Sequence, residues 1–169
     1  DRELQPDTLS WLALGVVANA EGVVRGKGRI DWSEDAVTST GRFSTDALDF
    51  AAAFGPVKGL SGTLEFTDLL GMVSAPDQKA HIASINPGIE VTDGEITYEL
   101  RPNSQLAVKG GHWPFLGGSL SLRPTVMNFG VAETRRYALV IDGLDAARLL
   151  ARMDMANRSV TGIFDGALP

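Results

Sequence analysis

The strongest constraint on the fold is an alternation of apolar and polar residues with a period of two. The run 94–100 reads Gly-Glu-Ile-Thr-Tyr-Glu-Leu, and the run 118–122 reads Gly-Ser-Leu-Ser-Leu. Alternation over four to eight residues is typical of strands with one buried face. It favours an antiparallel sheet, because the two faces of such a sheet can differ in polarity.

A glycine precedes several of these runs, at Gly28, Gly41, Gly62, Gly94 and Gly118. We interpret each one as a turn, a bulge or a close backbone approach at the start of a strand. The intervals between these glycines are irregular, so the sequence predicts a meander and not a solenoid of fixed period.

Three turns can be predicted from local chemistry. The pair Asp93–Gly94 lies between apolar runs and favours a two-residue hairpin turn. The segment Asn86–Gly88 contains a proline and a glycine in the order that turns prefer, and Pro102–Asn103 predicts a third turn.

Helix signals are few. Residues 145–153 predict a short helix with Asp145 as its N-cap. Residues 45–54 are a weaker candidate, ended by Gly55–Pro56. The apolar stretch 9–18 is too short to span a membrane, and we expect a buried strand there, with a helix as the alternative.

These signals indicate one mainly β domain over residues 1–169, with one or two short helices. The apolar side of its strands needs a cover. A second sheet, closure into a barrel, short helices or an apolar ligand would each provide one, and a closed dry core is the simplest of these. The alternating apolar positions are Ile30, Trp32, Phe43, Leu64, Phe66, Ile96, Tyr98, Leu100, Leu120 and Leu122.

Composition excludes several classes of function. The chain has no Cys and only 2 His, which excludes disulfides and thiolate metal sites and nearly excludes a histidine-rich metal centre. The 15 Lys+Arg against 21 Asp+Glu give a net charge of −6 without a basic stripe, so nucleic acid is not an expected partner. The sequence contains no run of 18 apolar residues, so it predicts no membrane-spanning helix.

The chain also lacks the common catalytic signatures, and we expect no enzyme activity, cofactor or metal. We interpret His81 and the carboxylates Asp93, Glu95 and Glu99 as solvated residues of a polar face, because general acid–base catalysis requires a carboxyl whose pKa is raised by burial. A carbohydrate-acting or esterase-like enzyme stays as a weak alternative, which would need a cleft with converging carboxylates or a Ser with a His.

An ordered set of short motifs resembles the C-terminal region of YdbH-type proteins, a family also labelled "dicarboxylate transport" and grouped with the AsmA-like and TamB-like envelope proteins of Gram-negative bacteria. The resemblance is clearest over residues 55–169. The segments that carry it are Gly59–Asp68, Ile85–Ile89, Val91–Tyr98, Trp113–Leu120, Gly143–Ala147 and Val160–Pro169.

The resemblance implies a curved antiparallel β-sheet that forms an open, taco-like groove, with a flattened sandwich or barrel as the alternative. It implies a periplasmic segment of an inner-membrane-anchored protein, part of a longer chain whose other regions contact the membrane. It also implies passage of phospholipids or other acyl-chain ligands between the two membranes, and pairing with a small outer-membrane lipoprotein by strand addition.

We therefore predict a non-enzymatic phospholipid-transfer segment. The alternating apolar positions named above would line its groove, and Trp113 and Phe115 would lie near a rim. Two alternatives stay open. One is a structural or interaction module of the cell envelope, whose sheet is closed and dry and which pairs with a lipoprotein partner by strand addition. The other is an accessory protein for dicarboxylate transport. The sequence shows no cluster of basic residues that could bind such an anion.

Overall fold

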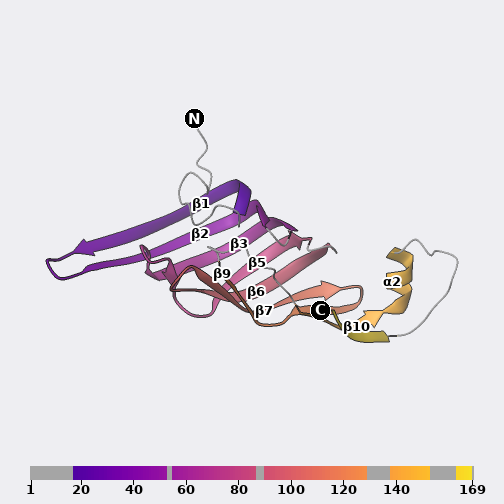
Figure 1. The fold of residues 1–169 in the computed structure, drawn as a ribbon. Coiled ribbons are helices and arrows are strands. Elements are labelled where there is room, and N and C mark those ends of the chain that lie inside the picture. Colours follow the sequence, from indigo (N-terminus) through magenta and orange to yellow (C-terminus); the bar gives the residue numbers. More distant parts are fainter. Residues whose placement is uncertain (1–16, 53–54, 87–89, 129–137, 153–162, 169) are drawn as a thin grey trace.

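A computed structural model describes residues 17–52, 55–86, 90–128, 138–152 and 163–168, and most of them form one β-sheet (Figure 1). The strands are β1 (Val17–Trp32), β2 (Val37–Ala52), β3 (Gly55–Asp68), β4 (Val73–Ser74), β5 (Gln78–Ile85), β6 (Val91–Arg101), β7 (Gln105–Phe115), β8 (Gly118–Leu122), β9 (Thr125–Asn128), β10 (Leu139–Asp145) and β11 (Ile163–Leu168). The helix α2 spans Ala146–Arg152.

The sheet is a meander in which spatial order follows chain order. Its path is β1-β2-β3-β5-β6-β7-β8-β10-β11, with β4 paired to β3 and β9 paired to β7. Every pairing is antiparallel. Within the described ranges β1 and β11 do not pair with each other, so the sheet is curved and unclosed. The prediction of an open, curved antiparallel sheet is confirmed, and the described strands form neither a sandwich nor a barrel.

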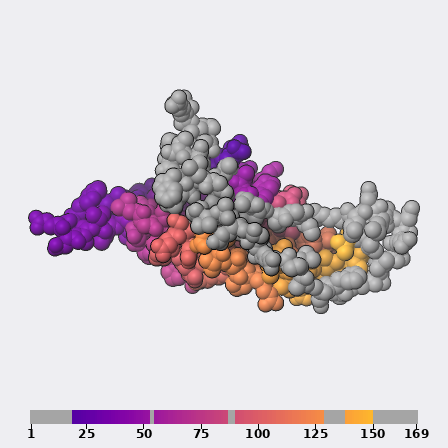
Figure 2. All heavy atoms as spheres, viewed as in Figure 1, coloured from indigo at the N-terminus to yellow at the C-terminus, as the bar shows by residue number. Residues whose placement is uncertain are grey.

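The body is elongated, and the hairpin of β1 and β2 projects beyond its other strands (Figures 1 and 2). These two strands are the longest, with 16 residues each. Trp32 lies opposite Val37 beside the turn that joins them. The far end of this hairpin therefore has few neighbours, and Trp32 is 75% exposed.

The glycines that we expected at strand starts mostly lie inside strands. Gly28 is within β1, Gly41 within β2, Gly62 within β3 and Gly94 within β6, and only Gly118 begins its strand. Their positions allow other groups to approach the backbone closely. A Cβ atom on Gly94 would lie 1.8 Å from the indole nitrogen of Trp113.

The prediction of a hairpin turn at Asp93–Gly94 is wrong, because both residues lie inside β6. Asp93 has a φ of 58°, a left-handed conformation that Asp adopts more readily than most residues. Gly59 has a φ of 59° in β3. The register places Ala83 of β5 between these two residues. We call Gly59, Ala83 and Asp93 the bulge line.

The bulge line shifts the alternation of side chains. In a regular strand, residues on one face are an even number of positions apart. Across the bulge line, Ile82 and Ile85 are three positions apart, yet both belong to one buried cluster. The pairing register of β3 with β5 and of β5 with β6 continues unbroken across this line, so the alternation reverses where Gly59 and Asp93 adopt a left-handed backbone. Additional apolar side chains therefore reach the buried side of the sheet.

The helix predicted at 45–54 is also wrong, because residues 37–52 form β2. Pairing with β1 on one side and β3 on the other outweighs the local helix preference of this alanine-rich stretch. The predicted helix after Asp145 is confirmed as α2, and the Asp145 carboxylate accepts hydrogen bonds from the backbone N–H groups of Ala147 and Arg148, at 2.9 and 3.3 Å.

The remaining expectations divide between confirmed and untested segments. A turn joins β6 to β7 at Pro102–Ser104, as the sequence predicted, with Asn103 at a φ of 64°. Most of the apolar stretch 9–18, and residues 87–88 of the predicted Asn86–Gly88 turn, lie outside the described residues.

Candidate lipid-binding face

One face of the sheet carries no charged side chain along a line that crosses eight strands. Residues that pair across an antiparallel sheet point to the same side. The register links one row from β1 to β10, in the order Val24, Thr45, Gly62, Ala80, Ile96, Gly111, Leu122 and Leu139. We call the side of the sheet that contains this row the apolar face.

All the residues predicted to line a groove lie on this apolar face. Ile30, Trp32, Phe43, Leu64 and Phe66 follow from the register of β1, β2 and β3. The other five belong to strands that the same row crosses, at even separations from its members: Ile96, Tyr98, Leu100, Leu120 and Leu122. The structure thus brings the predicted residues onto one continuous surface, while their contact with lipid stays a prediction.

The apolar face is divided into a packed part and a more open part. Its packed part is a buried cluster, in which Leu120 is 5% and Val57 is 2% exposed. The members of this cluster are Val57, Ile82, Ile85, Val91, Trp113, Phe115, Leu120 and Leu144. Most of the predicted groove residues lie outside the cluster and are half-buried: Ile30, Phe43, Leu64, Ile96, Tyr98, Leu100 and Leu122.

Trp113 and Phe115, which we expected near a rim, belong to the packed part. They are 4% and 7% exposed. The indole of Trp113 lies over two glycines, because a Cβ atom would come within 1.8 Å of it at Gly94 and within 2.5 Å at Gly111. Flat packing of a ring on glycine allows the large side chain to lie close to the sheet.

Aromatic rings also cover glycines at the β1–β2 end. A Cβ atom on Gly26 would lie 2.2 Å from the ring of Phe43, and one on Gly41 would lie 2.8 Å from it. The rings of Phe43 and Phe66 meet edge to face, with their centroids 5.8 Å apart and an interplanar angle of 82°. This geometry is a favourable one for two aromatic rings.

The opposite side of the sheet, which we call the polar face, carries ion pairs between strands. Arg42 meets Glu65 at 3.0 Å, and Lys79 meets Glu95 at 3.1 Å. His81 lies 3.4 Å from Asp93. The polar-face position predicted for His81, Asp93 and Glu95 is confirmed. Exposed pairs of this kind contribute little stability, about 0–1 kcal/mol each, and they keep this side of the sheet hydrated.

Glu99 has the least exposed side chain among the ion-paired carboxylates of the described residues, at 13%, so it is less solvated than the sequence predicted. Its carboxylate lies 2.8 Å from the ammonium of Lys109 and also pairs with Arg101. The hydrogen bonds from Lys109 and then Arg101 hold the pKa of Glu99 below its ordinary value. A carboxylate with a lowered pKa stays ionised at neutral pH and is a poor general acid.

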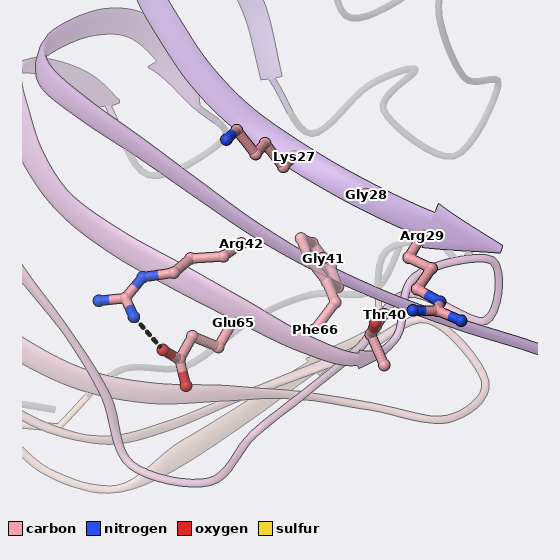
Figure 3. Close-up of a pocket in the computed structure, with 8 residues that line it drawn as sticks. All are labelled: Lys27, Gly28, Arg29, Thr40, Gly41, Arg42, Glu65 and Phe66. Atoms are coloured by element: carbon pink, nitrogen blue, oxygen red, sulfur yellow. Dashed lines mark ion pairs between the residues drawn. The ribbon is translucent and has the colours of Figure 1, made fainter.

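A shallow depression of about 360 Å³ opens beside β1, β2 and β3 (Figure 3). It contains the ion pair of Arg42 and Glu65, and Lys27 lies directly across from Arg42 in the register. Its lining residues are Lys27, Gly28, Arg29, Thr40, Gly41, Arg42, Glu65 and Phe66. Arg29 forms an ion pair with Asp31, with 2.7 Å between the guanidinium Nε and a carboxylate oxygen. The depression is open, and carboxylates accompany two of its three cations.

The described segments contain no candidate metal site and no helix that could cross a membrane. There, no three His, Asp or Glu side chains converge where a metal ion could bind. No described helix combines the length and the apolar character that crossing a bilayer requires.

Sequence reasoning missed part of the apolar face. Phe50 packs against the buried cluster, although its segment was predicted as a helix. Val57, Ile85 and Val91 reach the same cluster only because the alternation shifts at the bulge line. The sequence feature that could have predicted these residues is Gly59, because an isolated glycine within a strand often marks an irregular backbone. In the structure Gly59 has a positive φ.

A search of curated proteins and a search of solved structures each found no match. A protein-family profile described as "YdbH-like: Intermembrane phospholipid transport protein YdbH" matches residues 1–169, the full sequence. The chain therefore belongs to the YdbH-like family of intermembrane phospholipid transport proteins.

Proposed function

We propose that this chain is a non-enzymatic segment of a phospholipid path, in which acyl chains lie against the apolar face while the polar face remains in water. The uncharged row from Val24 to Leu139 carries this proposal. A charge in such a row would cost several kcal/mol once lipid displaced its water. A continuous uncharged row allows a lipid to move across strand after strand without a strong polar trap.

The half-buried residues of the apolar face are the proposed lipid contacts. Among the predicted groove residues, Ile96 and Leu122 belong to the uncharged row itself and stay partly accessible. Trp113 and Phe115 would act as a packed wall beside the path, since both are buried in the cluster.

The cellular setting extends the proposal. Membership of a phospholipid transport family of the envelope supports a periplasmic location for this segment. We propose that it is one β-rich domain of a longer chain, anchored in the inner membrane by other regions. We also propose that a small outer-membrane lipoprotein pairs with the longer protein by strand addition, which requires an unpaired sheet edge.

Site-specific photocrosslinking in intact cells tests the lipid path. A photoreactive residue at Ile96 is expected to capture phospholipid, because this position lies on the apolar face. The same residue at the neighbouring Thr97 should capture none, because Thr97 points to the polar face. The pair is a close control, since both side chains are partly exposed and adjacent in β6.

A second pair repeats the test in another strand, with Leu122 on the apolar face and Ser121 on the polar face. Lipid adducts at Ile96 and Leu122 but not at Thr97 and Ser121 would support the proposal. Equal capture on both faces, or no capture at any position in a folded protein, would show that the apolar face is not a lipid path.

A further inference from the structure

Most polar side chains on the apolar face have their hydrogen bonds satisfied within the protein. The hydroxyl of Ser39 donates to Asp68 at 2.7 Å and accepts from the backbone N–H of Leu70 at 2.9 Å. The hydroxyl of Thr45 donates to the carbonyl of Val23 at 2.9 Å. These polar groups would therefore present no open hydrogen-bond donor to a lipid.

Two further side chains follow the same pattern. The hydroxyl of Ser74 donates to the carbonyl of Ala75 and accepts from the backbone N–H of Leu100. The amide of Gln78 accepts from the backbone N–H of Glu65 and donates to the carbonyl of Pro76. Internal satisfaction of polar groups is thus the rule on this face.

Three donors depart from this rule among the described residues. The indole N–H of Trp113 is buried and has no acceptor. Its ring is packed against Gly94, which closes it off from any ligand. The hydroxyls of Tyr98 and Thr125 also make no hydrogen bond within the described part of the chain, and both side chains are only partly buried.

The two accessible hydroxyls share one register row. Tyr98 of β6 pairs with Val108 of β7, which pairs with Thr125 of β9. Two strand spacings separate them, or about 10 Å. Their side chains point to the same side of the sheet, on either side of Val108. Burial also raises the pKa of the Tyr98 phenol, so its hydroxyl stays protonated and remains a donor at neutral pH.

A lipid lying on this face would cover both hydroxyls. A covered hydroxyl without a partner costs about 1–3 kcal/mol, so the lipid must supply acceptors at these positions or bind less tightly. The glycerol and phosphate region of a phospholipid has ester and phosphate oxygens that can accept hydrogen bonds, whereas its acyl chains have none.

Resting on the proposed lipid path, we infer that Tyr98 and Thr125 form a binding site for the oxygen-bearing region of a glycerophospholipid. The two hydroxyls would donate to ester or phosphate oxygens of the lipid, and the acyl chains would extend from there over Ile96 and Leu122. The site gives the lipid a preferred position on the apolar face.

Binding of two pyrene-labelled probes to the full chain tests this inference. One probe is a phosphatidylcholine, and the other is a pyrenyl alkane without ester or phosphate oxygens. Tyr98→Phe and Thr125→Val each remove a hydroxyl with little change in shape. Each is expected to weaken phosphatidylcholine binding by about twofold to tenfold, the net worth of one hydrogen bond. Binding of the alkane should be unchanged.

Thr63→Val is the matched control, because Thr63 points to the polar face of β3. It should change the binding of neither probe, and thermal unfolding checks that every variant is folded. A Tyr98→Phe/Thr125→Val double variant that binds phosphatidylcholine as tightly as the unaltered protein would overturn the inference, and so would equal losses for both probes. An unaltered protein that binds neither probe would instead refute the proposed lipid path, and the inference with it.

Discussion

Gly94→Ala is expected to destabilise the protein strongly, although it adds one methyl group. The new Cβ would lie 1.8 Å from the indole nitrogen of Trp113 and 2.1 Å from a ring carbon. A rigid indole that is 4% exposed cannot yield by a simple change at its tip. The backbone itself should accept alanine, because Gly94 does not have a positive φ. The cost therefore comes from displacement of the ring.

Two estimates bracket the magnitude. Overpacking of a well-packed core costs about 1–3 kcal/mol. Complete loss of the burial of an indole, about 150–250 Å² at roughly 25 cal/mol per Å², would cost about 4–6 kcal/mol. We expect a loss near 3 kcal/mol in the free energy of unfolding, because the ring can tilt without leaving the cluster entirely. This corresponds to a fall in Tm of roughly 6–12 °C for a domain of this size.

Urea and thermal unfolding measure the loss, and tryptophan fluorescence should shift to longer wavelength as Trp113 becomes hydrated. Gly110→Ala is the matched control, because the nearest atom to its new Cβ is a carbonyl oxygen at an ordinary 3.6 Å. It should change stability by less than about 1 kcal/mol. If Gly94→Ala and Gly110→Ala were equally stable, the placement of the indole over Gly94 would be incorrect.

Three further predictions concern packing, pH and lipid transfer. Leu120→Ala should cost about 2–5 kcal/mol in unfolding experiments, because it leaves a cavity in the buried cluster, and a cost below 1 kcal/mol would contradict that packing. Because Lys109 holds the pKa of Glu99 below its ordinary value, Glu99 should stabilise the fold above about pH 4.5 and lose this effect as the pH falls through its folded-state pKa. The stability difference between the unaltered protein and Glu99→Gln should therefore shrink on acidification, and a constant difference would argue against the ion pair. Ile96→Glu should reduce phospholipid transfer between vesicles by about tenfold or more, since it places a charge in the uncharged row, whereas Thr97→Glu on the polar face should leave transfer unchanged.

Much of the fold could be predicted from the sequence because its main determinant is local. The alternation in 94–100 assigns side chains to two faces without knowledge of the partner strands, and the register confirms that Ile96, Tyr98 and Leu100 share one face. The cap at Asp145 is equally local, since its carboxylate meets the N–H groups two and three residues later.

The failures arise where distant contacts outweigh local preference. Asp93–Gly94 has the chemistry of a hairpin turn, but pairing of this part of β6 with β5 keeps it within a strand. The segment 45–54 contains good helix formers, yet the two neighbouring strands hold its first residues in the sheet.

The division of the apolar face could not be predicted either. Phe66 and Leu64 are two residues apart in β3 and have the same alternation, but the first is buried and the second is half-buried. This difference depends on which side chains lie above them, and the edge-to-face contact of Phe66 with Phe43 joins residues from different strands. The spacing of residues within one strand cannot predict a contact between side chains of different strands.

In this meander, each hairpin adds a fixed increment to the length of the sheet across its strands. Neighbours in the sheet are close in the sequence, so each strand contacts little beyond the strands beside it. Successive strands lie about 4.8 Å apart, so the nine strands of the main path span about 38 Å, close to the thickness of one bilayer. Inserting one more hairpin would extend the surface by about 10 Å and disturb only the strands at the insertion. Proteins built in this way can match the distance between two membranes by gaining or losing hairpins, while the width set by their strands stays constant.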